Sequence, residues 1–135
     1  MIANSDNALI QNALGDDNGH NGGSECTLNS LDALAHEFEN GRAYLQIHIT
    51  AFPSPGEIRG NIGPGDAVGI FDADINVDQM VLDGIDDTTP WDSVTSSGTV
   101  EFNTGHHSNH IDYSIAADVD GVIGIHVHHG SPGEN

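Results

Sequence analysis

The 135-residue chain has no lysine, only two arginines and a single cysteine. Asp and Glu together number 21, so the formal net charge at pH 7 is -19. A chain this acidic is repelled by nucleic acid and by anionic membrane surfaces, and it attracts cations. We therefore expect no nucleic-acid partner. The lone Cys26 allows neither an internal disulfide nor a cysteine-based metal site.

Long apolar runs are also missing. No segment approaches the ~18 residues of a membrane-spanning helix, so no membrane insertion is expected. The N-terminal segment lacks the basic region and the apolar stretch of a secretory signal peptide. The protein is thus expected to be either cytoplasmic or a piece of a longer chain, and the ending shortly after the last strand favours the second. The acidic surface favours an extracellular or cell-surface location.

What the chain does contain is glycine and short alternations of apolar and polar residues. Its 17 glycines and 5 prolines suit many short strands joined by turns. Apolar spacing predicts one helix over residues 27–40, followed by a stop at Gly41. Alternation predicts strands at residues 43–50, 57–62, 67–77, 97–102, 110–117 and 122–129. The predicted fold class is all-β: an antiparallel β-sandwich or barrel of short strands with one short helix.

The strand at 43–50, "AYLQIHIT", alternates most clearly. Leu45 and Ile47 are expected to face the core, and Tyr44, Gln46 and His48 the solvent, which predicts a half-buried strand.

Two segments resemble parts of the CHRD, or chordin-type, domain family. Residues 27–62, with "AYLQIHIT" followed by "GEIRG", are similar to the closing half of such a repeat. Residues 67–135, with "SGTVEF" and "HVHHGSPGEN", are similar to the opening half. The resemblance implies a linker at 63–66 and the two halves in reversed order. The polar composition of residues 1–26 predicts a weakly ordered lead-in.

The reversed order has two interpretations. The chain is either a window cut from tandem repeats or a circular permutant, whose halves reassemble within one chain or exchange between chains as a domain-swapped homo-oligomer. The function that the resemblance implies is that of a non-enzymatic extracellular module for adhesion, self-assembly or binding of a protein partner.

Histidines suggest an alternative function, which is copper or zinc binding. Residues i and i+2 of a strand share a face, so His126 and His128 project together. The resemblance implies that His48 approaches them when the two halves pair. Three imidazoles with an open position would make a zinc- or copper-type site, although histidines on a sheet are also ordinary polar surface. Weaker candidate ligands follow strand 97–102: His106, His107 and His110.

Two further resemblances are weaker. "GIHVHHG" resembles the copper-binding strand of copper–zinc superoxide dismutase, which implies a redox protein as a remote alternative; the downstream ligands that this enzyme needs have no counterpart here. The acidic loop "DGIDDTTPWD" offers a weak calcium site, with candidate ligands Asp83, Asp86 and Asp87. Asp72 and Asp74 imitate the start of an EF-hand, but a solvated strand face is the simpler interpretation.

The sequence contains no nucleophile elbow and no phosphate-binding loop, so nothing in it calls for an enzyme. Arg59, one of the two basic residues, is expected to pair with Glu57 on its own strand.

Overall fold

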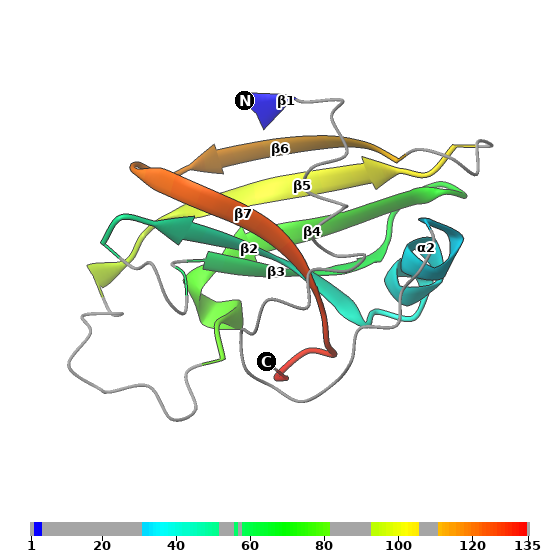
Figure 1. The fold of residues 1–135 in the computed structure, drawn as a ribbon, viewed down its shortest axis with the longest axis horizontal. Helices are drawn as coiled ribbons and strands as arrows, with labels where there is room; N and C mark the ends of the chain where they lie inside the picture. The colour runs from blue at the N-terminus through cyan, green and yellow to red at the C-terminus, as the bar shows by residue number, and fades with distance from the viewer. Residues whose placement is uncertain are drawn as a thin grey trace.

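The structure is a computed structural model that describes residues 2–3, 31–51, 56, 58–81, 93–105 and 111–134. The seven strands of these described residues form one antiparallel sheet in the order β1-β6-β5-β4-β3-β2-β7 (Figure 1). The predicted all-β class with one short helix is confirmed. The elements are β1 (Ile2–Ala3), α2 (Leu31–Glu39), β2 (Ala43–Ile49), β3 (Ile58–Pro64), β4 (Ile70–Asn76), the 3-10 helix η1 (Val77–Gln79), β5 (Ser97–Asn103), β6 (Asp112–Asp118) and β7 (Val122–His129).

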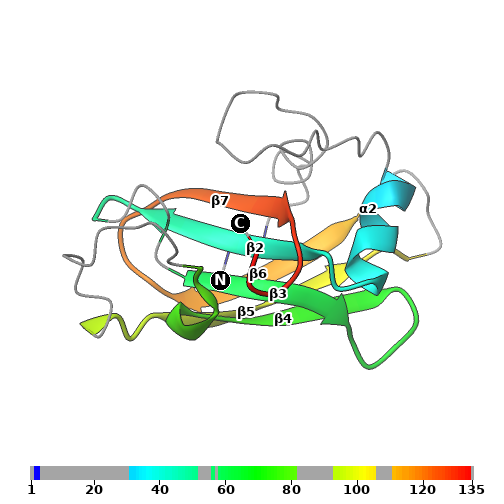
Figure 2. The ribbon, with the colours of Figure 1, turned by 90° about the horizontal axis from the view of Figure 1, so that it is seen from below.

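The sheet curls into half a barrel. Strands β6 and β7 lie near opposite ends of the strand order, yet only residues 119–121 connect them. A connection of this length spans at most about 15 Å, so the two end strands must approach each other. Thr50, just after β2, holds the connection, because its N–H donates to the carbonyl of Gly121 at 2.9 Å. Figure 2 shows β7 and β2 on one side of the curl and β4 and β5 on the other.

The hydrophobic core fills one face of this sheet, and α2 closes one end of it (Figure 1). The ring of Phe38 on α2 lies 4.9 Å from that of Phe102 and 5.5 Å from that of Phe71, measured between centroids. Burying each large apolar side chain stabilises the fold by about 1.5–3 kcal/mol. The strands supply alternate residues to this core, among them Leu45, Ile47, Ile58, Ile62, Ala73, Ile75, Val100, Ile115 and Val127.

Helix α2 ends as the sequence predicts. Gly41 has a φ of 63°, in the left-handed region that favours glycine. The N–H groups of Gly41 and Arg42 donate to the carbonyls of Phe38 and Glu37 at 3.1 and 2.9 Å, which satisfies the last turn of the helix. Residues 27–30 of the predicted helix lie outside the described residues.

Strands from residues 27–62 and strands from residues 67–135 belong to the same sheet. β2 and β3 come from the first segment and lie between β7 and β4 of the second. Gly63 and Pro64, which the sequence assigns to a linker, are the last residues of β3 and pair with Asp72 and Phe71 of β4. The two segments therefore pack as one domain in this structure.

The prediction that β2 is half-buried is wrong. Tyr44 and Gln46, expected to face solvent, are 3% and 5% exposed. The residues after β7 cover this face: a Cβ at Gly130 would lie 3.0 Å from Cε1 of Tyr44. Met80, just after η1, lies against Gln46, with 3.9 Å between Sδ and Nε2. A local alternation cannot reveal such a cover, because it comes from segments distant in the sequence.

Among the described residues, no helix has both the length and the apolar character needed to cross a membrane.

Candidate metal centre

Strand pairing brings three predicted histidines together. On the face of the sheet opposite the core, β2 contributes His48 and β7 contributes His126 and His128. The two strands are antiparallel neighbours, with His48 opposite Gly124 and His126 opposite Gln46. One ring nitrogen from each histidine lies within 4.8 Å of those of the other two. The structure thus assembles the set of side chains that the sequence predicts as a metal site.

The register of β2 against β7 keeps these histidines on one face. Leu45 is paired with Val127 and Ile47 with Ile125, and these residues belong to the core or pack against it. A slip of one residue would turn the apolar side chains away from the core and the histidines toward it. Burial of the apolar residues therefore fixes where the imidazoles lie.

The histidine rings are close together, but their nitrogen atoms are farther apart than the ligands of a bound metal ion. The centroids of His48 and His126 are 5.0 Å apart, and those of His126 and His128 are 5.8 Å apart. In a tetrahedral zinc site with Zn–N bonds of 2.0–2.1 Å, nitrogen atoms are separated by about 3.3 Å. The ring nitrogen atoms would have to approach one another by roughly 1.5 Å at most, and small rotations of the side chains can supply this movement.

The three histidines are only partly exposed to solvent. The Nε2 atoms of His48 and His128 are shielded from solvent. Imidazole donors in a partly shielded position can bind zinc or copper and still leave a coordination position for solvent.

An aromatic and cationic stack supports the centre. The ring of Tyr44 is stacked on the imidazole of His128, and the Cζ atom of Arg59 lies 3.4 Å from the centroid of the Tyr44 ring. Burial raises the pKa of the Tyr44 hydroxyl, although the charge of Arg59 opposes this shift. Tyr44 is therefore a neutral ring in contact with both a cation and a candidate ligand.

Arg59 also holds the chain after β7. Its guanidinium donates to the carbonyls of Glu134 at 2.6 Å and Ser131 at 3.1 Å, and to Oδ1 of Asn61 at 3.2 Å. Burial lowers the pKa of Arg59, while its proximity to Tyr44 and Glu134 acts in the opposite direction. Glu57, the partner that the sequence predicts, lies outside the described residues. The contacts with the carbonyls were not predicted, because strand alternation carries no information about the C-terminal turn.

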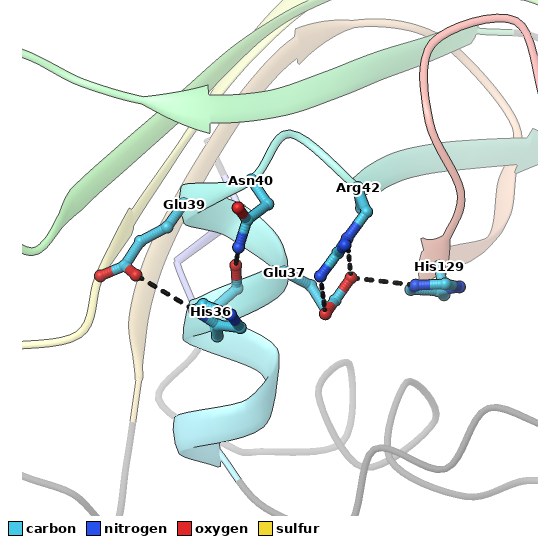
Figure 3. Close-up of polar contacts among 6 residues, drawn as sticks. All are labelled: His36, Glu37, Glu39, Asn40, Arg42 and His129. Carbon is cyan, nitrogen blue, oxygen red and sulfur yellow. Dashed lines mark hydrogen bonds and ion pairs between the residues drawn. The ribbon is translucent and has the colours of Figure 1, made fainter.

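A second polar cluster joins α2 to β7 (Figure 3). Arg42 donates through Nε and Nη2 to the two carboxylate oxygens of Glu37, both at 2.8 Å. Nε2 of His129 lies 2.9 Å from Oε2 of the same carboxylate. The hydrogen bonds from Arg42 lower the pKa of Glu37 more than its burial raises it, and His129 adds to the lowering. A sequence signal did exist, since Arg42 is one of two basic residues and follows Glu37 by little more than a helical turn.

The remaining candidate ligands are not brought to this site. Asp72 and Asp74 lie exposed on β4, in an open depression that they share with Glu101, which agrees with a solvated strand face. Within the part of the chain that the structure describes, no other three His, Cys, Asp or Glu side chains meet as the histidines do. The weaker candidates lie outside the described residues: His106, His107, His110, Asp83, Asp86 and Asp87.

Comparison with protein-family models, curated proteins and solved structures gave no match to this chain. The resemblance to CHRD domains, and the extracellular adhesion or assembly role that it implies, therefore stay predictions. Function has to be argued from the chain's own residues.

Proposed function

We propose that the domain binds a copper or zinc ion through His48, His126 and His128. One observation carries the proposal: ring nitrogens from two paired strands lie within 4.8 Å of one another. Imidazole is a preferred ligand of both metals, and three protein ligands with one open position are typical of zinc sites that react with solvent or substrate.

The electrostatics of the chain favour a cation at this site. The formal net charge of -19 attracts cations from solution, and the neutral imidazoles supply the soft nitrogen donors that carboxylates lack. The many acidic side chains favour calcium or magnesium instead, so the histidines provide selectivity for a transition metal.

Calorimetric titration of the chelator-treated protein with Cu²⁺ and with Zn²⁺ tests the proposal. Millimolar calcium in the buffer occupies nonspecific carboxylates. We expect one ion bound per chain at micromolar affinity or tighter, and loss of this binding in the double variant His126→Ala/His128→Ala. The matched control is His36→Ala, because His36 is 67% exposed on α2 and is not one of the clustered histidines.

Binding that is equally tight in the double variant would contradict the proposal. It would assign the metal to the acidic surface, and leave the histidines as polar residues of the sheet.

A further inference from the structure

Gly124 lies within β7, directly opposite His48 of β2. Glycine inside a strand weakens it, because the unfolded backbone is freer and there is no side chain to pack. Gly124 is not among the glycines with positive φ, in contrast to Gly121 at 71°, which precedes the strand. Its backbone conformation therefore does not require glycine, and another reason is needed.

The space beside Gly124 supplies that reason. A Cβ at this position would lie 3.3 Å from Nε2 and 3.7 Å from Cε1 of His126, and 4.0 Å from Cβ of His48. A side chain here would project among the candidate ligands. At Gly63, a strand glycine that also lacks a positive φ, a Cβ would meet nothing within 4 Å.

The residues around this space are neither fully buried nor fully exposed. Gly124 and the three histidines are all partly exposed, while the Nε2 atoms of His48 and His128 are shielded from solvent. Three histidines leave the fourth position of a tetrahedral ion without a protein ligand.

We infer that Gly124 keeps the fourth coordination position of the metal centre open to a small exogenous ligand. The inference rests on the proposed function. The ligand class is water, hydroxide or another small monodentate anion, because the space is that of a missing side chain and a bound metal ion favours anions. The centre is then of the open kind that exchanges a ligand, rather than a closed structural site.

The test uses Cu²⁺ with azide as the anionic probe. Wild type, Gly124→Ala and Gly63→Ala are each loaded with one equivalent of Cu²⁺, and azide is titrated while the azide-to-copper charge-transfer absorption is recorded. We expect azide to bind to wild type and to Gly63→Ala alike. We expect the affinity of azide for Gly124→Ala to be lower by about tenfold or more, because an added methyl group in a small pocket weakens ligand binding to this extent.

The outcomes separate the two claims. If copper-loaded wild type shows no azide band, the inference is overturned whatever the variants do, and the metal proposal stands. Equal azide affinity in wild type and Gly124→Ala also overturns the inference. Loss of copper binding in Gly124→Ala alone overturns it as well, because the glycine would then be needed to make room for the metal ion or the imidazole rings. If wild type binds no copper, the proposed function fails and the inference fails with it.

Discussion

The ring of Tyr44 lies parallel to the imidazole of His128, with an interplanar angle of 8° and 5.0 Å between centroids. The two residues are directly paired on β2 and β7. Because Tyr44 is only 3% exposed and the guanidinium of Arg59 also lies over its ring, the tyrosine has little freedom to move. The stack therefore orients His128, which makes Tyr44 a positioning residue for the proposed metal centre.

Replacing Tyr44 with leucine should weaken metal binding. An aromatic pair contributes about 0.5–1.5 kcal/mol beyond its buried area, so Tyr44→Leu should lower the affinity for Zn²⁺ by about threefold to tenfold. Tyr44→Phe keeps the ring and should restore the affinity of wild type. Calorimetry on the three proteins measures this, and equal affinities for the leucine and phenylalanine variants would refute a role for the stack.

Metal binding should stabilise the fold, since the site joins β2 to β7. An ion present at 100 times its dissociation constant stabilises the native state by about 2.7 kcal/mol. We expect Zn²⁺ to raise the midpoint of thermal unfolding of wild type, and a chelator to reverse the change. His48→Ala should abolish this response and His36→Ala should keep it. A response that survives in His48→Ala would exclude His48 as a ligand.

Glu37 should make stability sensitive to acid. Its pKa in the folded protein is lowered from the ordinary value of 4.5, so its ionised form is favoured by folding. This contribution is fully present above the pKa of the unfolded chain and is lost as the pH falls through the lowered pKa. Glu37→Gln should therefore cost about 1–2 kcal/mol at pH 7, and the difference from wild type should shrink below pH 4.5.

Glu39→Gln is the matched control for Glu37. Its carboxylate is mostly exposed and lies 3.4 Å from Nδ1 of His36 (Figure 3), a surface contact of little energetic value. Urea unfolding of both variants across a pH series gives the comparison. Equal losses in the two variants at pH 7 would show that the cluster of Glu37, Arg42 and His129 adds no particular stability.

The stability of the fold should depend on the planar guanidinium group of Arg59. It is completely buried, stacks on Tyr44 and donates to two carbonyls of the C-terminal turn. Lysine keeps the charge but has neither the planar stack nor the forked donors, so Arg59→Lys should destabilise the fold by about 1–3 kcal/mol. The free energy of urea unfolding measures the loss. A variant as stable as wild type would mean that the turn does not depend on these hydrogen bonds.

Local patterns predicted much of the secondary structure. Alternation located β2 and β7, and the helical spacing ended α2 at Gly41, because a strand repeats every two residues and a helix every 3.6. The same two-residue repeat placed His126 and His128 on one face. These features depend on neighbouring residues alone, so the sequence was sufficient for them.

Which strands lie next to each other in the sheet depends on contacts between residues distant in the sequence. Nothing local indicates that β7 pairs with β2 instead of β6, which precedes it in the chain and is joined to it by a short turn. Nor does alternation reveal that the polar face of β2 is covered, or that Glu37 reaches His129.

By itself, then, the sequence determined the all-β class, the helix that ends before Gly41 and the strand face that His126 and His128 share. Only the tertiary structure decided that His48 meets His126 and His128, that Arg59 secures the C-terminal turn, and that Gly124 borders the cluster. The physical reason is that backbone geometry sets local periodicity. Strand pairing and curl instead follow from burying the apolar faces of all the strands together in one core.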